Sequence, residues 1–375
     1  ICPKQAAKRQ GEYGGEVFTD YVVMLDRIKP DAVWICTPSG VRRGPLLACA
    51  ERGIPAFCEK PTERSEAGAA AIARDLARRK ARVQIGYVFR SIPAVRRLRE
   101  VWQGDAIHLV QSFYACGVSL NMALPAWFYD QAKSGGALVD QATHNLDLLR
   151  SLFGEVRTVL GCARNPVRNK KGAYTIDETL SLSLAFANGL VGSHSHTWVG
   201  DAWRNELVFS GEKRLYRLFP ALGRLVVEQP GVKSGNPFGR ALARTAAPGV
   251  FQFEPKPGSM YDYEDAIFLE MVKTGNWRGN PCSYADGVKT LRLTLGCVRA
   301  LAEEHGYVAH SAARSMRTGS SALVGLIVPD VRNDFYGSAA MALARCCDEQ
   351  GFQLVLAATQ DDPESELRQV RGLLE

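Results

Sequence analysis

Hydrophobic and polar positions follow two different periods over the first hundred residues. Three segments carry the helical period, and Asp20 precedes the first of them as a capping residue. The predicted helices are Tyr21–Lys29, Pro45–Arg52 and Glu66–Lys80. The apolar runs between and after them are predicted to be buried strands: Asp31–Thr37, Ile54–Cys58 and Val83–Val88. Strands without alternation, separated by helices, indicate a parallel sheet covered on both faces, so residues 1–105 are expected to form a doubly wound, Rossmann-like domain.

A different pattern begins after a predicted helix at Pro93–Trp102. Three segments now alternate apolar and polar residues, as strands with one buried face do: Ile107–Ala115, Thr179–Phe186 and Leu190–Trp198. A long helix, Gly136–Phe153, is predicted between the first two strands. Strands grouped together with a helix on one face favour an α+β domain built on an open sheet, spanning residues 106–297.

The last region, residues 298–375, returns to an α/β pattern. Its predicted elements alternate strand and helix in the order Ala322–Val328, Ser338–Gln350, Gln353–Ala357 and Glu364–Leu374. The chain stops within the last predicted helix, so this third region is expected to be a partial α/β core. The whole chain is thus of the α/β class, with an α+β middle domain.

Composition excludes several classes of protein. A hydrophobic share of 46% and a charged share of 23% are those of an ordinary globular protein. No apolar run approaches the roughly 20 residues that cross a bilayer, so no membrane partner is expected. The ten cysteines form no Cys-x-x-Cys pair. They favour reduced thiols in a cytoplasmic protein.

Neither a metal site nor a nucleic-acid interface is expected from the remaining polar residues. His194 and His196 alternate on a predicted strand, which supplies too few ligands for a metal and favours an exposed sheet face. The net charge of +7 suits an anionic cofactor or substrate, although such a charge is more often only a solvated basic surface. Basic tracts interleaved with aromatic residues are absent from the sequence, so nucleic acid is not an expected partner.

Two short motifs directly follow predicted strands. Thr37-Pro38-Ser39 comes directly after the apolar run DAVWIC, and Glu59-Lys60-Pro61 comes directly after the run IPAFC. Both therefore lie at carboxyl ends of parallel strands, where such sheets bind ligands. A lysine there can hydrogen-bond a ribose or substrate hydroxyl and assist the transfer of its proton. The alternative is that Glu59 and Lys60 are an ordinary solvated loop pair ahead of a helix.

A third motif, GGALVDQATH, covers residues 135–144 and contains Asp140 and His144. These two residues are four apart on the predicted helix, so they share one face. A carboxylate beside an imidazole raises the pKa of the histidine, which makes His144 a candidate acceptor of a hydroxyl proton. The alternative is a buried polar pair on a core helix, since Leu138, Leu146 and Leu149 face inward.

The order of these motifs resembles the Gfo/Idh/MocA oxidoreductases (the glucose–fructose oxidoreductase and inositol dehydrogenase superfamily). The resemblance rests on TP, EKP, GYVFR at residues 86–90 and GGALVDQATHNLDLL, and it extends from about residue 10 to about residue 297. It implies hydride transfer between NAD or NADP and a hydroxyl or carbonyl group of a sugar or cyclitol. It also implies a homo-oligomer formed through the sheet of the second domain.

The resemblance assigns site residues in three groups. The catalytic centre comprises Lys60, Asp140 and His144, with His144 as the base, Asp140 orienting it and Lys60 polarising the same oxygen. The residues expected to contact the cofactor are Thr37, Pro38, Glu59 and Lys60. The residues expected to contact the substrate are Tyr87, Arg90, Asp140 and His144.

One departure from the family pattern concerns the start of the Rossmann-like domain. The family opens with a strand, a Gly-x-Gly-x-x-Gly turn and a helix that binds the pyrophosphate, and no such glycine pattern occurs in this sequence. The parallel sheet is therefore expected to be incomplete, the choice between NAD and NADP cannot be read, and the 375-residue chain alone is expected to have impaired activity. A catalytically inactive scaffold is the corresponding alternative function.

The last region resembles a different family, the LacI-type transcription regulators. The segment from about Val298 to Gly337 carries this resemblance, with Ala313–Met316 matching the hinge that leads into a sugar-binding core of the periplasmic-binding-protein type. The helix-turn-helix that should precede the hinge is replaced by oxidoreductase-like sequence. A fragment of a sugar-responsive regulator is therefore the second alternative function, and a fused or truncated reading frame is the expected origin of this segment.

Overall fold

The protein is described by a computed structural model in which the following residues are placed: 3–118, 126–165, 176–200, 203–228, 249–252, 260–304, 323–328, 334–350 and 353–358. The chain divides into two compact units, Ile1–Glu304 and His305–Glu375. No helix among the placed residues combines the length and the apolar character needed to cross a membrane.

The first unit begins with a three-stranded parallel sheet, which confirms the Rossmann-like architecture. Its strands pair in the order β1-β2-β3. They are β1 (Val33–Ile35), β2 (Ala56–Cys58) and β3 (Val83–Ile85). The accompanying helices are α1 (Pro3–Tyr13), α2 (Tyr21–Ile28), α3 (Arg43–Glu51) and α4 (Glu66–Arg78). Helix α2 begins where expected because the Asp20 side chain accepts hydrogen bonds from the backbone amides of Val22 and Val23.

The strands are shorter than the apolar runs that predict them. Strand β1 gives way at its carboxyl end to a short 3-10 helix, η1 (Ser39–Val41), and β3 gives way to η2 (Val88–Arg90). The residues of the Thr-Pro, Glu-Lys-Pro and GYVFR motifs therefore lie in the turns that follow the strands. The strands and helices share one hydrophobic core. Its buried side chains include Ile35, Leu46, Ile72 and Ile85.

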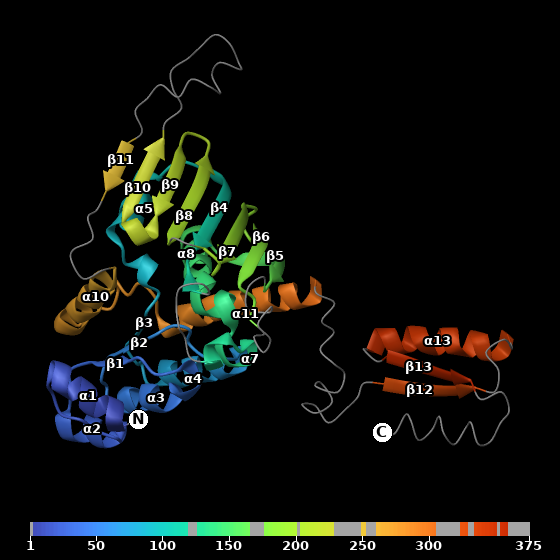
Figure 1. Ribbon diagram of the computed structural model, residues 1–375, viewed down its shortest axis with the longest axis horizontal. Coiled ribbons are helices and arrows are strands. Elements are labelled where there is room, and N and C mark those ends of the chain that lie inside the picture. Colours follow the sequence, from blue (N-terminus) through green and yellow to red (C-terminus); the bar gives the residue numbers. More distant parts are fainter. Residues whose placement is uncertain are drawn as a thin grey trace, which may run out of the picture. The chain divides into compact units, whose positions relative to one another are not determined.

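A second, mixed sheet forms the larger part of the first unit (Figure 1). Within the described residues it has eight strands in the order β11-β10-β9-β8-β4-β7-β6-β5, and only β4 and β7 pair in parallel. Its strands are β4 (Ile107–Ala115), β5 (Val156–Arg164), β6 (Thr179–Phe186), β7 (Val191–Thr197), β8 (Arg204–Gly211), β9 (Leu215–Phe219), β10 (Arg224–Glu228) and β11 (Gly249–Gln252). A 3-10 turn, η6 (Pro220–Leu222), joins β9 and β10.

One face of this sheet is covered by helices, as the alternating strands predict. Leu98 of α5 (Pro93–Val101) and Leu146 and Leu149 of α8 (Thr143–Phe153) share a core with inward residues of the sheet such as Val110 and Phe209. The opposite face carries the alternate residues of the same strands. This arrangement confirms the expected mixed α+β domain.

The prediction of one continuous helix over residues 136–153 is wrong. This stretch is divided into a π-helical segment, η4 (Leu138–Ala142), and α8, and it is preceded by η3 (Ala126–Tyr129) and α7 (Gln131–Ser134). Gly135 and Gly136 both adopt positive φ, and a Cβ on Gly135 would lie 2.5 Å from the Cβ of Val139. The glycine pair thus permits a tight entry into the π-helical segment, which carries Asp140. Single π-helical turns are frequent at functional sites.

Helix α11 (Tyr284–Glu304) connects the two sheets of the first unit. It follows α10 (Tyr261–Thr274) and packs on α4 beside the first sheet and on α8 and β5 of the second (Figure 1). Leu291 belongs to the core of the first sheet, while Cys297 and Leu301 belong to the core of the second. One helix therefore contributes to both cores.

The second unit contains a strand–helix–strand motif. Strands β12 (Leu323–Val328) and β13 (Gln353–Ala358) pair in parallel, with α13 (Asp334–Gln350) between them in the sequence. These elements agree with the α/β pattern predicted from the sequence. The hinge-like residues 313–316 and the predicted helix at residues 364–374 lie outside the described residues.

Candidate active site

The Glu-Lys-Pro loop at the carboxyl end of β2 is held by Arg42, whose side chain enters from the turn between η1 and α3. Its guanidinium donates from Nε to the carbonyl of Thr37 at 2.8 Å and from Nη2 to the carbonyl of Lys60 at 3.1 Å. Nη1 donates to the carbonyls of Glu59 and Pro61. The Lys60–Pro61 peptide bond is cis. Sequence reasoning missed Arg42, for which the only signal was a basic residue soon after the Thr-Pro motif.

The Lys60 side chain extends from this loop to the π-helical segment. Its Nζ donates to the backbone carbonyl of Asp140 at 2.5 Å and to Asp140 Oδ1 at 3.3 Å. The Lys60 side chain is 16% exposed and that of Asp140 is 38% exposed. Because the carboxylate is in contact with water, the ion pair contributes little to stability, and its main consequence is geometric. It fixes the ammonium group where the carboxyl ends of the first sheet meet the second domain.

His144 lies close to Lys60 but is not paired with Asp140, contrary to the sequence-based interpretation. Its ring contacts Tyr87, with centroids 6.2 Å apart, and Phe89, with centroids 5.5 Å apart. Burial, together with the positive charge of Lys60, lowers the pKa of His144 well below its usual value, instead of the expected rise. The carboxylate that was to raise this pKa is engaged by Lys60. Within the described residues, Nδ1 of His144 is buried without a hydrogen-bond partner.

Arg90 occupies a structural position in place of the expected contact with substrate. Its Nε and Nη2 form a two-pronged pair with the carboxylate of Asp147 at 2.6 and 2.5 Å. Its Nη1 donates to Asp286 and to the carbonyl of Pro281, the latter at 2.8 Å. Every guanidinium nitrogen is thus used inside the protein, and the residue ties η2 to α8 and to the start of α11.

The other candidate residues from the sequence, Tyr87, Thr37, Pro38 and Glu59, differ in burial and in their contacts. Tyr87 is buried, which raises the pKa of its phenol well above the usual range, and it supports the His144 ring. Thr37 has a buried Oγ1 with no partner among the placed residues. Pro38 lines the pocket described below, and a carboxylate oxygen of Glu59 accepts from the backbone amide of Lys60 at 3.2 Å.

His194 and His196 are buried, so the expectation of an exposed sheet face is wrong for them. They point to the helix-covered side of β7, where burial lowers the pKa of His194 to about 3. Burial and the neighbouring His194 and His144 lower the pKa of His196 as well. Nδ1 of His194 is 2.9 Å from Ser112 Oγ, which accepts a hydrogen bond from Asn145. In the part of the chain that is placed, no three His, Cys, Asp or Glu side chains converge as metal ligands.

A pocket of about 350 Å³ lies at the carboxyl ends of the first sheet. Lys60 and Asp140 line it, and His144 is not among its lining residues. Arg42, Arg64 and Ser39 line the same pocket, as do apolar residues of α11 and of the segment before α8: Phe128, Val139, Leu291, Leu295 and Val298. Its lining therefore combines charged and hydroxyl-bearing side chains with apolar ones.

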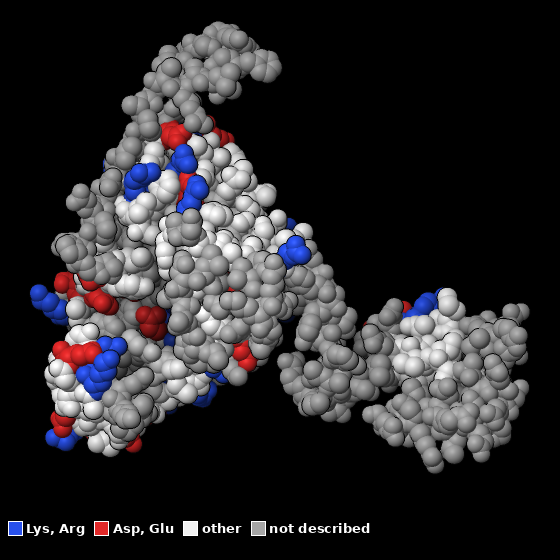
Figure 2. Space-filling view, viewed as in Figure 1, with Lys and Arg blue, Asp and Glu red and all other residues white. Residues whose placement is uncertain are grey.

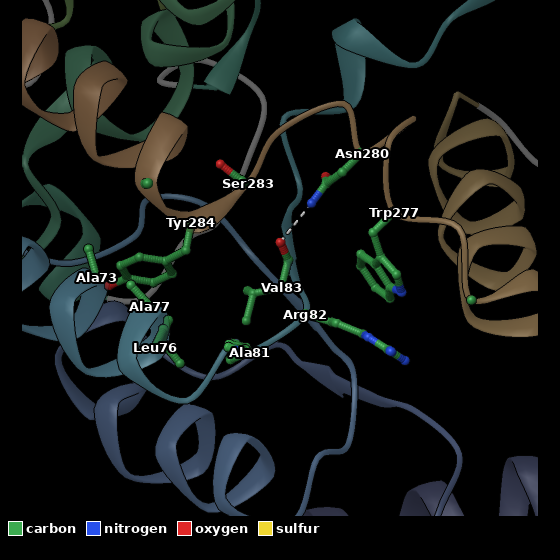
Figure 3. A pocket seen from close by; sticks show the side chains of 13 residues that line it. Ala73, Leu76, Ala77, Ala81, Arg82, Val83, Trp277, Asn280, Ser283 and Tyr284 are labelled. Carbon is green, nitrogen blue, oxygen red and sulfur yellow. Dashed lines mark hydrogen bonds between the residues drawn. The ribbon is translucent and has the colours of Figure 1, made fainter.

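A larger cavity, of about 480 Å³, lies at the opposite end of the same sheet. Residues that precede β3, the end of α4 and the turn before α11 line it, and Figure 3 shows Ala77, Tyr284 and Trp277 around it. Asn280 donates to the carbonyl of Val83 there at 2.9 Å. Its cations, Lys80 and Arg82, are exposed. The larger cavity contains no acid–base pair comparable to Lys60 and Asp140.

The residues around the smaller pocket fit the nicotinamide half of a dinucleotide. The Lys60 ammonium and the Arg64 guanidinium line the pocket and supply donors, while Arg42, whose donors bind backbone carbonyls, adds positive charge at the carboxyl ends of the strands. Over the face of the molecule in Figure 2, by contrast, acidic and basic side chains are interspersed, so the net positive charge does not gather in one field on that face. The positive groups near Lys60 are therefore a local feature.

Comparison with known proteins agrees with this geometry. The model of the oxidoreductase family's NAD-binding Rossmann fold matches residues 2–87, and that of the GFO/IDH/MocA C-terminal domain matches residues 95–217. The chain is 26% identical over 344 residues to levoglucosan dehydrogenase of Pseudarthrobacter phenanthrenivorans, covering 80% of this chain and 86% of that protein. A solved levoglucosan dehydrogenase, in complex with NADH and levoglucosan, superimposes with a TM-score of 0.68 at 22% identity, again covering 80% and 86% of the two chains.

A shorter match concerns a protein of another class. The chain is 34% identical over 97 residues to the catabolite repressor/activator of Escherichia coli, which covers 26% of this chain and 28% of that protein. This match gives weak support to the regulator-like resemblance and covers too little of either chain to assign a regulator. The two family models, in contrast, cover the first sheet and strands β4 to β8 of the second, with the motif residues at the expected strand ends. The chain belongs to the Gfo/Idh/MocA family of NAD-binding oxidoreductases.

Proposed function

We propose that this protein is a dehydrogenase that oxidises a hydroxyl group of a sugar or cyclitol, with Lys60, Asp140 and His144 at its catalytic centre. The observation that carries the proposal is the contact of Lys60 with Asp140 at the carboxyl ends of the parallel strands, close to the partly buried His144, whose pKa is lowered. This combination supplies a fixed positive charge and an unprotonated base within one region. The base accepts the proton of an alcohol, and the positive charge stabilises the alkoxide that forms.

The roles of the three residues follow from their environments. Burial keeps His144 unprotonated at neutral pH, so its imidazole can accept the hydroxyl proton. The Lys60 ammonium stabilises the negative charge that develops on the same oxygen, and Asp140 holds that ammonium in place. The nicotinamide, when bound, supplies the acceptor for hydride. We assign Thr37 and Pro38 to contact with the cofactor, which is supported by their place after β1 and by Pro38 in the pocket lining, and Tyr87 to the support of the His144 ring.

The relatives support the substrate class and one of the two cofactors. The similar curated protein is a levoglucosan dehydrogenase, and the similar solved structure contains NADH and levoglucosan. We therefore place sugars, including anhydrosugars, ahead of cyclitols as substrates, and NAD ahead of NADP. A regulator function is not favoured, because the match to a repressor covers only 26% of the chain.

The test is a substrate screen with the purified 375-residue chain. Formation of NADH or NADPH is followed by absorbance with levoglucosan, common hexoses and inositols, while fluorescence titration measures cofactor binding separately. Because the sequence contains no Gly-x-Gly-x-x-Gly turn to bind the pyrophosphate, slow NADH formation with at least one sugar is expected. Cofactor binding without turnover of any sugar or cyclitol would contradict the substrate class. Failure to bind either cofactor would favour the inactive scaffold.

The pH dependence of the reaction tests the role of His144. Because its pKa is lowered well below 6.5, the base is unprotonated at neutral pH and kcat should be constant from pH 6.5 to about 8. It should fall only in more acidic solution, where the imidazole becomes protonated. An acidic limb centred at or above pH 6.5 would exclude this histidine, in its buried state, as the base.

The outward face of the larger sheet supports a homo-oligomer. Leu109 and Val191 are register partners on β4 and β7 and lie on this face, as do Phe113 and Leu160. All four are exposed, Leu160 by 68%. Adjacent exposed apolar residues on a sheet are typical of a surface that another molecule covers. Light scattering should show an oligomer that Leu160→Glu with Val191→Glu converts to a monomer, and a monomeric unmutated chain would contradict the proposal.

A cytoplasmic location is also retained as a proposal. Nine cysteines are described and all are free thiols, which is typical of a reducing compartment. Thiol titration of the protein directly after cell lysis should find these cysteines reduced. Disulfide formation in the native protein would argue for an oxidising compartment.

A further inference from the structure

Arg42 is a buried cation without a carboxylate partner among the hydrogen bonds of its guanidinium. Its side chain donates to four backbone carbonyls, those of Thr37, Glu59, Lys60 and Pro61. The residue is 4% exposed. These carbonyls belong to the turns that follow β1 and β2, so one side chain joins the two turns that carry the Thr-Pro and Glu-Lys-Pro motifs.

The chemistry of these contacts makes arginine difficult to replace. Four carbonyl oxygens directed toward one point repel one another unless donors lie between them. A guanidinium presents five N–H groups in a rigid plane and keeps its charge, whereas a lysine presents one compact ammonium at the end of a flexible chain. Arg42 satisfies the carbonyls from a single fixed position.

The contacts of Arg42 also fix the backbone from which the Lys60 side chain extends. Lys60 lies between two of the bound carbonyls in sequence, and its own carbonyl is bound by Nη2 of Arg42. From this fixed backbone its Nζ reaches the carbonyl and carboxylate of Asp140. A displacement of the loop backbone would therefore move the ammonium away from both oxygens.

We propose that Arg42 is a positioning residue for the dehydrogenase reaction: by binding the carbonyls of the two strand-end turns it sets the location of the Lys60 ammonium relative to Asp140. This inference rests on the function proposed above. It assigns to Arg42 no contact with the reacting atoms. A misplacement of about 1 Å at a reacting group lowers rates by roughly 100-fold, so a loss of that order is expected when Arg42 is removed.

The test compares Arg42→Ala and Arg42→Lys with Arg43→Ala. Arg43 is a matched control because it is the adjacent residue and it pairs with Asp75 at 2.8 Å, away from the loop. Arg42→Ala should lower kcat about 100-fold with a KM for sugar within about threefold of that of the unmutated chain. Arg42→Lys should keep the charge and still lose most of kcat, while Arg43→Ala should keep kcat within about twofold.

A second measurement does not depend on activity. Lysines are labelled by reductive ¹³C-methylation, and the Lys60 resonance is assigned by its loss in Lys60→Arg. Arg42→Ala, which introduces no lysine of its own, should shift this resonance, while Arg43→Ala leaves it unchanged. If the unmutated chain turns over no sugar, the proposed function is overturned. The Lys60 resonance would still show whether Arg42 positions the Lys60 ammonium.

Two outcomes overturn the inference. One is a folded Arg42 variant in which both kcat and the Lys60 resonance match those of the unmutated chain. The other is a loss of kcat that only parallels the unfolded fraction, as measured by circular dichroism of the same samples, because a merely structural residue would behave in that way. Partial restoration of kcat in Arg42→Ala by millimolar guanidinium, but not by ammonium, supports it.

Discussion

The two ends of the three-stranded sheet differ in chemistry although each carries a cavity. The cavity at the amino end of β3 is the larger, about 480 Å³ against about 350 Å³, and its cations are exposed to solvent (Figure 3). At the carboxyl ends, Arg42 and Lys60 are largely buried and make defined contacts with backbone and side chains. Volume therefore does not locate the site. The ends of the strands do, because only there do the loops of successive strands converge.

The largest expected difference between the two ends is in activity. Lys60→Met removes the ammonium at Asp140 and should lower kcat/KM roughly 10³-fold, since both proton transfer and charge stabilisation suffer. The matched control is Lys80→Met at the opposite cavity, for which no change beyond about twofold is expected. Steady-state kinetics with the sugar found in the screen measure both. Equal losses of kcat/KM in Lys60→Met and Lys80→Met would show that the two ends of the sheet do not differ in their role in catalysis.

The next effect concerns stability near the carboxyl ends. Arg90→Met leaves the buried carboxylate of Asp147 without its two-pronged partner, and removal of one member of a buried ion pair costs about 3–5 kcal/mol. Arg82→Met, at the opposite end, should change the free energy of unfolding by no more than about 0.5 kcal/mol. Urea denaturation of the two variants provides the comparison. A loss below about 1 kcal/mol for Arg90→Met would mean that Asp147 finds other partners.

A buried carboxyl on α10 makes the stability of the protein depend on pH. Burial, with the nearby charges of Glu59 and Asp265, raises the pKa of Glu264 from 4.5 to about 9. Between these values the folded protein binds more protons than the unfolded chain, so the stability that this group gives at low pH is lost as the pH rises. The free energy of unfolding should fall by about 1.4 kcal/mol per pH unit, which is about 2 kcal/mol from pH 6 to pH 7.5.

Glu264→Gln should remove this slope. The variant and the unmutated protein are expected to have similar free energies of unfolding near pH 4.5, and the variant should be the more stable of the two at pH 8. Within the described residues Oε2 of Glu264 has no hydrogen-bond partner, so the amide replaces a neutral acid without breaking an observed bond. Parallel pH profiles for the two proteins would show that this carboxyl is ionised in the folded state.

The smallest expected effect is that of filling the larger cavity. Ala77→Leu places three more carbons in the wall of the cavity in Figure 3 without changing any charge. Values of kcat and KM within about twofold of those of the unmutated protein are expected, because no contact from this cavity reaches Lys60 or Asp140 among the described residues. A loss of more than tenfold would place the amino end of β3 within the functional site.

The candidate site was only partly predictable, and the reasons differ from residue to residue. The position of Lys60 after a buried strand was sufficient to place it at a carboxyl end. The spacing of Asp140 and His144 suggested a direct pair, but that argument assumes regular α-helical geometry and no competing cation. The structure has a π-helical segment at Asp140, and Lys60 from the loop after β2 binds the carboxylate. Arg90 ends the GYVFR motif, which suggested substrate contact, yet its carboxylate partners are 57 and 196 residues away in the sequence.

The sequence by itself determined the α/β order of the elements, the parallel first sheet, the one-sided strands of the second and the strand ends at which Thr37 and Lys60 lie. These features depend on local periodicity and on the handedness of connections, which the order of residues contains. Only the tertiary structure decided which charges meet. In the folded protein Asp140 pairs with Lys60, and His194 and His196 are buried. Arg42 binds four carbonyls that belong to two separate turns. Burial and charge pairing depend on residues distant in sequence, and one chain read along its length does not show which of them become neighbours.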